Sequence, residues 1–419
     1  MLKKFKINNN LNYLYYPTKK YKSFMIKIYF FLPFNKKKIT IRNLLKDLLN
    51  YNSKNYSYFD LLAKRKSLYN LSWKISNLCS SNLHRYVLTI SGTNPKYFND
   101  EEYTFDKIFE LINEVLFNPN IEDNLFDEET FNYCSSRYKN SLIKTMENKD
   151  YIVVYESTKL LPKNDVNNYF NLGYLEDFEK ITNEALYKEY QDFLKSKILI
   201  SVAGDIDNKE LKYNFRKYFN NFSEFKNKLI STPTKYQKEK IKIIKYKTEQ
   251  SILMMTFASE ISQFSEKYFD LLMLNVLYGE DVSSKLFQVI REKYGYCYDI
   301  YSMLDATSGT IIVYMGIDYK NIKKAKVLVL DLLNEIKEGK FSKTLLSINK
   351  KNNYSEVQKI YDNLDTTLTR EVNLYLFNRD SSLKTLKESL NGVTKEEIMN
   401  CANNIKLIST VIMKPKRGE

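Results

Sequence analysis

The stretch LFQVIREKYGYCYDIYS, Leu286–Ser302, decides how the rest of the sequence is interpreted. Its pattern predicts a short helix, a stop at Gly295 and a tyrosine-rich strand. At 1.5 Å per helical residue and 3.3 Å per strand residue, Arg291 lies about 6 Å before the glycine and Tyr298 about 10 Å beyond it. If the chain reverses at Gly295, the guanidinium and the phenol can point into a common space.

The neighbouring residues predict how this corner is held. Ser283 or Ser284 can cap the helix start, and Gly295 can adopt the left-handed conformation just past the helix end. Leu286, Phe287 and Ile290 are expected to anchor the helix in a core. Strand alternation then predicts two opposite faces: Tyr296, Tyr298 and Ile300 on one, Cys297, Asp299 and Tyr301 on the other.

Length and composition predict a folded chain of more than one domain. The 419 residues and 49.8 kDa exceed one ordinary core, and the 43% of hydrophobic residues suffices for packed cores. The formal net charge of +15 is spread over lysines interspersed with acids, with no basic tail. We therefore expect no nucleic-acid binding, although an acidic peptide would suit this charge.

Cysteine usage and hydropathy predict a soluble cytoplasmic protein that does not act on a membrane. The four cysteines are scattered, with no C-x-x-C pair, which is typical of a reducing compartment. The N-terminal segment MLKKFKINNN lacks the apolar core of a signal peptide. The apolar run Phe24–Phe34 contains Lys27 and a proline and is too short to span a bilayer.

The order of predicted elements occurs twice along the chain. LINEV at 111–115 recurs as LLNEI at 332–336, an offset of 221 residues, and Thr182 and Thr394 each begin a helix that precedes a strand. These landmarks predict an α+β fold of two similar domains, 1–220 and 242–419, each a mainly antiparallel sheet packed with helices. A lysine-rich linker, 221–241, is expected between them.

The individual elements follow from hydrophobic periodicity. The expected strands are Ser23–Phe34, Leu71–Ser81, Arg85–Thr93, Ile198–Asp207, Ser251–Ser259, Tyr296–Leu304, Thr310–Gly316 and Leu407–Met413, and the expected helices include Ile41–Asn50, Tyr58–Tyr69, Phe105–Phe117, Glu128–Glu147 and Glu266–Tyr278.

Catalytic motifs are missing from the sequence. His84 is the single histidine, has no G-x-S-x-G turn beside it, and is expected to be a surface or turn residue before a strand. There is no phosphate-binding glycine loop. The carboxylates Asp127–Glu129 precede or begin a helix, where they favour the helix dipole. The chain alone is therefore predicted to be catalytically silent.

The opening stretch resembles the C-terminal signature of the pitrilysin/insulinase metallopeptidases, the family that includes mitochondrial processing peptidase. The family pattern L-F-x-x-I-R-E-x-x-G-x-x-Y is met in full from Leu286 to Tyr298. Further similar landmarks are LINEVLFNPNI (111–121), GYLEDFEKITNEALYKEY (173–190) and VAGDID (202–207). The resemblance covers most of the chain and implies the duplicated fold, with each chain forming half of a clamshell.

Active members of that family carry an H-x-x-E-H zinc motif on the first helix of the N-terminal domain. Counting back from Asn52-Ser53, where the family usually has Gly-Thr, the motif falls on 43–47. Asn43 and Asp47 then replace the histidines, and Lys46 replaces the glutamate. A further glutamate ligand would fall near Asn140-Ser141. An ammonium group repels Zn²⁺ and accepts no proton, so this chain is expected to bind no metal.

The resemblance is greatest to the non-catalytic partner of bacterial two-chain members. There an H-x-x-E-H sister supplies zinc and the general base, while the silent subunit holds the substrate backbone through an arginine and a tyrosine, which correspond to Arg291 and Tyr298. From the residues alone an alternative remains open, in which Arg291 is a structural arginine and Tyr298 a core tyrosine.

The expected function is therefore that of a zinc-free, substrate-binding subunit of a heterodimeric cytoplasmic peptidase acting on unfolded or precursor peptides. Two alternatives remain. One is a structural scaffold subunit, like the core proteins of respiratory complex III, and the other is a homodimeric peptide-binding protein without proteolysis.

Overall fold

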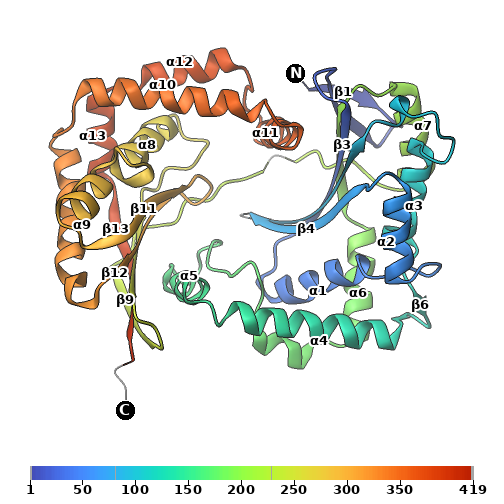
Figure 1. The fold of residues 1–419 in the computed structure, drawn as a ribbon, viewed down its shortest axis with the longest axis horizontal. Coiled ribbons are helices and arrows are strands. Elements are labelled where there is room, and N and C mark those ends of the chain that lie inside the picture. The colour runs from blue at the N-terminus through green and yellow to red at the C-terminus, as the bar shows by residue number, and fades with distance from the viewer. Residues whose placement is uncertain (1, 81, 228, 417–419) are drawn as a thin grey trace. The chain divides into compact units, whose positions relative to one another are not determined.

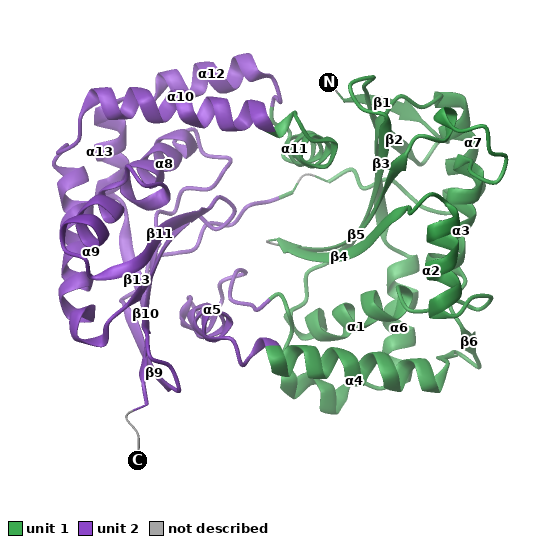
Figure 2. Ribbon diagram, in the orientation of Figure 1, with its two compact units in different colours: residues 1–144, 171–229, 360–379 green, residues 145–170, 230–359, 380–419 purple. Residues whose placement is uncertain are grey.

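The computed structural model describes residues 2–80, 82–227 and 229–416. Two compact units are seen (Figure 2), unit 1 with 1–144, 171–229 and 360–379, and unit 2 with 145–170, 230–359 and 380–419. Each unit thus includes one segment from the other half of the sequence. The domains expected from the sequence, 1–220 and 242–419, are contiguous and so do not include the exchange of these two segments, 145–170 and 360–379.

Unit 1 is built on a six-stranded sheet of order β1-β2-β8-β3-β5-β4, in which β2 and β8 are parallel and the other pairs antiparallel (Figure 1). Its strands are β1 (Lys3–Lys6), β2 (Asn12–Pro17), β3 (Ser23–Pro33), β4 (Ser72–Ser80), β5 (Leu83–Thr93) and β8 (Lys197–Gly204), with the short pair β6 (Ile121–Glu122) and β7 (Leu125–Phe126). Its helices are α1 (Ile39–Leu49), α2 (Tyr58–Ser67), α3 (Phe105–Phe117), α4 (Glu128–Thr145), α6 (Asn183–Leu194), α7 (Asn208–Phe219) and α11 (Leu364–Leu376), with 3₁₀ turns η1 (Lys36–Lys38), η2 (Pro95–Tyr97) and η3 (Leu175–Lys180).

Unit 2 contains a five-stranded sheet of order β11-β12-β10-β13-β9, in which β13 and β9 are parallel. Its strands are β9 (Lys240–Tyr246), β10 (Ser251–Ala258), β11 (Cys297–Asp305), β12 (Thr310–Ile317) and β13 (Lys406–Pro415). Its helices are α5 (Lys149–Leu160), α8 (Tyr268–Asn275), α9 (Ile322–Lys337), α10 (Lys343–Ile360), α12 (Leu383–Gly392) and α13 (Lys395–Asn403), with the π-helical segments η4 (Val276–Glu280) and η5 (Phe287–Lys293) and the turn η6 (Tyr319–Asn321).

The two sheets repeat one topology. Strands β2, β3, β4, β5 and β8 of unit 1 follow in sequence, and pair in space, as β9, β10, β11, β12 and β13 do in unit 2. The predicted α+β fold with two similar, mainly antiparallel domains is therefore confirmed. The predicted helix starts are confirmed too, since Thr182 and Thr394 cap α6 and α13, the latter in a capping box with Glu397.

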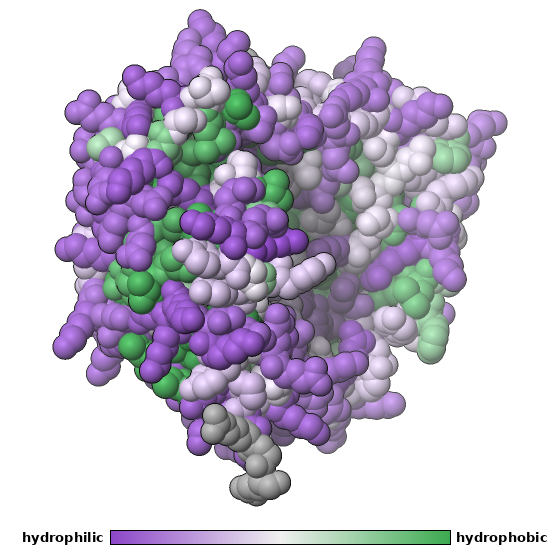
Figure 3. Space-filling model, turned by 60° about the vertical axis from the view of Figure 1, so that its left-hand side comes forward, coloured by the Kyte–Doolittle hydropathy of each residue, from purple (hydrophilic) through white to green (hydrophobic). Residues whose placement is uncertain are grey.

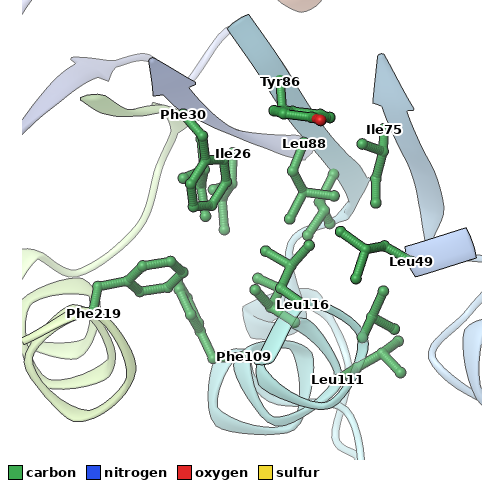
Figure 4. Close-up of a cluster of buried hydrophobic side chains, with 14 of the residues drawn as sticks. Ile26, Phe30, Leu49, Ile75, Tyr86, Leu88, Phe109, Leu111, Leu116 and Phe219 are labelled. Carbon is green, nitrogen blue, oxygen red and sulfur yellow. The ribbon is translucent and has the colours of Figure 1, made fainter. Parts of the chain in front are cut away.

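Strand β3 lies at the centre of unit 1 and is buried on both faces, which explains its unbroken apolar sequence. Phe24, Ile26, Ile28 and Phe30 face the core beneath α3 and α7, where they meet Phe109 and Phe219 (Figure 4). The alternate residues Met25, Tyr29 and Phe31 pack in a second cluster with α11. Because alternate side chains of β3 point to opposite faces of the sheet, this strand contributes to two hydrophobic clusters.

Helices α5 and α11 lie in the two exchanged segments, 145–170 and 360–379. Each packs against the sheet of the unit that it joins. Val153 of α5 packs against β10 and β13, and Leu364, Leu368 and Val372 of α11 pack against β3 and β8. On the same face of β3, the buried ammonium group of Lys27 forms an ion pair with Asp365 of α11. Each exchanged segment therefore belongs to the sheet it covers.

His84 corrects one prediction. It was expected at the surface or in a turn, but its side chain is fully buried on β5. The prediction was wrong because β5 begins at Leu83, which brings His84 into the ladder opposite Cys79 of β4. Its Nδ1 lies 3.2 Å from Cys79 Sγ.

The molecular surface is mostly hydrophilic on the face drawn in Figure 3, where apolar residues gather only in separate patches. Across the described residues, no helix combines the length and apolar character needed to cross a bilayer.

Candidate functional site: the Arg291–Tyr298 corner

The helix of the opening stretch is a π-helical segment, η5, that ends at a glycine. Leu286 and Ile290 are fully buried and fix it to the core, as predicted, while Phe287 is only half-buried. Gly295 has φ +60°, which confirms the predicted left-handed residue. The N–H groups of Gly295 and Tyr296 donate to the carbonyls of Arg291 and Ile290 and so close the helix.

The start of this helix differs from the prediction. Ser283 Oγ donates to Asp281 instead of capping η5. Ser284 Oγ is buried and has no hydrogen-bond partner within the described part of the chain. The prediction of a serine cap is therefore wrong, and the helix begins without a side-chain cap.

Arg291 and Tyr298 come together in space. The Arg291 Cζ atom lies 5.3 Å from the centroid of the Tyr298 ring and 4.4 Å from that of the Phe287 ring. The guanidinium thus contacts two aromatic rings, one from its own helix and one from the following strand. Such cation–π contacts are worth about 0.5–1 kcal/mol at exposed sites. The corner predicted from the glycine stop therefore forms.

Tyr298 does not share a face with Ile300, which corrects a second prediction. Its side chain is 82% exposed, whereas Ile300 and Cys297 are buried and Tyr301 is 39% exposed. The reason is a bulge in the β11–β12 pairing between Cys297 and Asp299, which removes Tyr298 from the alternation. The bulge presents the phenol to solvent beside Arg291.

The polar edges of both side chains are available. Arg291 is 34% exposed, and its ion-pair partner is the adjacent Glu292, with Nε 3.5 Å from Oε1. Among the described residues, neither the Arg291 guanidinium nor the Tyr298 hydroxyl forms a hydrogen bond. Stacking uses the faces of a guanidinium and leaves its N–H groups free in the plane. The corner therefore offers several hydrogen-bond donors to a ligand.

Strand β11 extends this surface with residues that sequence reasoning did not single out. It lies at the edge of its sheet, and Tyr301 and Met303 are exposed on it. Tyr301 stacks on Tyr314 of β12 at 5.2 Å between centroids, and the Tyr314 hydroxyl donates to Asp150 of α5. Burial, followed by this carboxylate, raises the pKa of Tyr314. The signal for Tyr301 in the sequence was the run of tyrosines on the predicted strand Tyr296–Leu304.

The positions of the zinc motif lie on α1, as the resemblance implied. Asn43 is buried, and its Nδ2 donates to the carbonyls of Ile39 (3.1 Å) and Asn171 (3.0 Å). Its Oδ1 accepts a hydrogen bond from Asn77 Nδ2 at 3.3 Å. The amide therefore joins α1 to a neighbouring loop and to β4, using both its donor and its acceptor.

Lys46 and Asp47, the other two positions of the motif, form an ion pair with each other. Lys46 Nζ lies 3.1 Å from Asp47 Oδ1. Nearby on α4, burial raises the pKa of the Cys134 thiol to about 12 and raises the pKa of Tyr138, so both stay protonated. An amide already hydrogen-bonded, an ammonium group and a paired carboxylate do not fit tetrahedral Zn²⁺, which takes imidazole, thiolate or carboxylate ligands. That the chain holds no zinc stays a prediction.

The family comparison gives one domain match. Residues 180–353 match the model described as the peptidase M16 inactive domain, a span that includes Arg291 and Tyr298. Many other structures share the fold, including a chain of complex III from Candida albicans, at a TM-score of 0.73 with 12% identity over 98% of this chain and 94% of the other. The fold therefore occurs within multi-protein complexes.

Two of the similar proteins span almost the whole chain. A Bacillus subtilis protein described as a probable inactive metalloprotease is 24% identical over 96% of this chain and 95% of its own. An uncharacterized zinc protease of the same organism is 25% identical over 56% and 58% of the two chains. The crystal structure of a conserved protein from Enterococcus faecalis V583 covers 100% of this chain and 99% of its own at 24% identity, with a TM-score of 0.92. Together with the absence of H-x-x-E-H from a sequence with one histidine, these matches show that the chain is similar to members of the pitrilysin/insulinase (M16) metallopeptidase family that are described as inactive.

Proposed function

We propose that this chain is the non-catalytic, substrate-binding subunit of a heterodimeric zinc peptidase that cleaves unfolded or precursor peptides. The observation that supports it most is the pairing of Arg291 with Tyr298 at an exposed corner. Both side chains are held in place by stacking, and their donor groups form no hydrogen bond with the described residues.

The chemistry of the corner suits a peptide backbone. An extended peptide has carbonyl groups that are left unpaired on one side when its other side pairs with a strand. A planar guanidinium and a phenol hydroxyl can donate to two such carbonyls. Holding a substrate on both sides of the scissile bond reduces the entropy cost of reaction, which is a large catalytic contribution.

In this proposal the partner supplies zinc and the general base through its own H-x-x-E-H helix. The two zinc-motif positions Asn43 and Lys46 support this division, because neither the hydrogen-bonded amide nor the ammonium group can replace imidazole or carboxylate. We place the complex in the cytoplasm of a bacterium. The bacterial relatives and the four scattered cysteines, with no C-x-x-C pair, are consistent with this placement.

The test is reconstitution with an H-x-x-E-H protein encoded in the same genome, followed by cleavage of an unstructured fluorogenic peptide. We expect cleavage only when both chains are present. Arg291→Ala should lower kcat/KM by at least tenfold while the heterodimer assembles with unchanged affinity. Lys293→Gln is the matched control, since it removes a nearby surface cation two residues away and should have no such effect.

Activity of the partner alone at the level of the mixture would contradict the proposal. Loss of assembly in Arg291→Ala would assign the arginine a structural role instead.

The similarity to a chain of complex III favours a second candidate, a scaffold subunit. In that case, replacing both Arg291 and Tyr298 by alanine would leave the peptidase activity of the complex unchanged. Light scattering on the isolated chain, together with peptide binding, would separate the third possibility of a homodimeric binding protein.

A further inference from the structure

A cavity of about 560 Å³ lies within unit 1, where β3 ends and β8 begins. It belongs neither to the Arg291–Tyr298 corner nor to the zinc-motif positions. Its size is within the range of small-molecule and peptide-terminus sites, about 300–1,000 Å³. It joins an apolar floor to a basic rim, and the two parts come from different elements.

The floor of the cavity is aromatic. Phe31 of β3 and Phe225 stack with ring centroids 3.8 Å apart and planes 12° from parallel. The stack forms because the segment around Phe225 runs beside the start of β8, with Phe225 N–H donating to the Ile198 carbonyl at 2.8 Å. The half-buried side chains of Leu83 and Phe34 also line the cavity.

Two lysines, Lys195 and Lys197, line the cavity beside this aromatic floor. Lys197 pairs with Phe31 in the β3–β8 ladder, so the two side chains share one sheet face. Lys195 lies two residues earlier, just after α6, and both lysines are exposed and line the cavity. Neither forms an ion pair or side-chain hydrogen bond with any residue that the structure describes.

The other charged residues of the lining are Lys38, Arg42 and Asp192, and their charges are paired. Lys38 lies 2.7 Å from Glu189 and 2.8 Å from Asp192, and Arg42 Nε lies 2.6 Å from Glu189. These two cations and two carboxylates cancel, so the charge of Lys195 and Lys197 remains as an excess of two. Between them, Ser196 is buried, and its Oγ finds no partner among the described residues. The charged residues at the cavity therefore carry a net positive charge, which favours an anionic ligand.

We infer that this cavity binds a carboxylate carried on an apolar group, with the apolar group over Phe31 and Phe225 and the carboxylate between Lys195 and Lys197. Charge-assisted hydrogen bonds from ammonium groups to a carboxylate are shorter and stronger than neutral ones. The C-terminus of a peptide that ends in an apolar residue has this chemistry, and so does a free arylalkanoic acid. The inference stands independently of the proposed clamp, because it concerns other residues.

The experiment is calorimetric titration of the full chain with N-acetyl-Ala-Ala-Phe and with its C-terminal amide. Acetylation removes the amino charge, so the two ligands differ in the carboxylate alone. We expect the free acid to bind at least tenfold more tightly, with a preference that shrinks in high salt. The double variant Lys195→Gln/Lys197→Gln should abolish the preference, whereas Lys209→Gln, an exposed lysine of α7 without an ion pair, should keep it.

Titration with 3-phenylpropanoate distinguishes the two sources of the carboxylate. Affinity similar to that of the peptide acid would support a free acid as the ligand, and much weaker binding would support a peptide C-terminus. Equal binding of acid and amide, or no binding of either, would overturn the inference. It would also be overturned if Arg291→Ala removed the preference while the lysine double variant retained it, since the ligand would then lie at the other site.

Discussion

The guanidinium of Arg291 lies against the ring of Tyr298, 5.3 Å from Cζ to the ring centroid, although the two residues belong to a helix and a strand. Two local distortions produce this contact. The left-handed Gly295 reverses the chain, and the bulge after Cys297 turns the phenol out of the β11 alternation. The donors of the corner are therefore positioned by backbone geometry, with the side chains fixed by stacking.

The Tyr298 hydroxyl and the Tyr298 ring have separable roles. Tyr298→Phe retains the platform for Arg291 and removes one donor, so kcat/KM of the reconstituted complex should fall about threefold to tenfold, the range of a hydrogen bond worth about 1 kcal/mol. Tyr298→Ala also removes the stacking and should lower kcat/KM further. Steady-state kinetics on one peptide substrate measures both.

Tyr319→Phe is the control for this comparison, because Tyr319 is an exposed tyrosine of η6, outside the candidate site. Equal kinetics of Tyr298→Phe and the unmodified chain would show that the phenol hydroxyl donates nothing to the substrate.

Gly295 and Gly309 provide a second prediction, since both have positive φ but different surroundings. A Cβ at Gly295 (φ +60°) meets no atom within 4 Å, so Gly295→Ala should cost only the left-handed backbone strain, about 1–2 kcal/mol. A Cβ at Gly309 (φ +64°) would lie 2.0 Å from the Ile261 carbonyl oxygen. Gly309→Ala should therefore cost about 1–3 kcal/mol more through overpacking.

Urea denaturation of the two variants measures this difference. Equal midpoints would mean that the loop at Gly309 relaxes without cost. Gly295→Asn offers an internal check, because asparagine tolerates the left-handed region better than alanine and should recover part of the loss.

Local sequence signals predicted the elements whose apolar residues alternate or recur. Helix α3 has the predicted bounds, Phe105–Phe117, because Thr104 caps it and one face is fully apolar. Helix α10 was not predicted, since it buries only Leu346 and Asn349 and most of its residues are polar. Strand β9 begins at Lys240, inside the expected linker; none of its residues is buried, and it is held by pairing with β13.

At the candidate site, the sequence predicted the glycine reversal and the approach of Arg291 to Tyr298, but not the strand faces. Period-two alternation assumes an unbroken ladder, and a bulge is a property of two strands together. The buried His84 escaped prediction for a similar reason, because its burial depends on where the β4–β5 pairing begins. The exchange of α5 and α11 is tertiary and has no local signal.

The buried pair Arg42–Glu189 predicts a strong, asymmetric effect on stability. The side chains are 3% and 2% exposed, with Nε 2.6 Å from Oε1, and Arg42 Nη1 also donates to the Pro33 carbonyl at 2.9 Å. Glu189→Ala leaves the guanidinium buried without this partner and should cost about 3–5 kcal/mol. The double variant Arg42→Met/Glu189→Leu should recover most of that loss, because it removes both charges.

A double-mutant cycle of Arg42→Met, Glu189→Leu and the double variant, measured by thermal denaturation, gives the coupling energy of the pair. Additive losses in the two single variants, with no recovery in the double variant, would contradict a direct interaction of this strength.

His84 predicts a pH dependence with a defined sign. Burial, together with the nearby cations Arg42 and Arg85, lowers the pKa of its imidazole to about 3, against an ordinary value of 6.5. The unfolded chain therefore takes up a proton below about pH 6.5 while the folded chain does not, so this residue's contribution to the free energy of unfolding is present above pH 6.5 and is lost as the pH falls toward 3. The slope approaches about 1.4 kcal/mol per pH unit.

Since the chain has one histidine, its imidazole resonance can be followed by NMR without assignment, and it should not shift between pH 8 and pH 5. A titration midpoint near 6.5 would show that the ring is solvated. Asp270 acts in the opposite direction, because burial raises its pKa to about 6 and the folded chain then binds a proton before the unfolded chain does. The stability difference between the unmodified chain and His84→Asn, followed from pH 7 to pH 4, cancels that contribution and should change in favour of the variant as the pH falls.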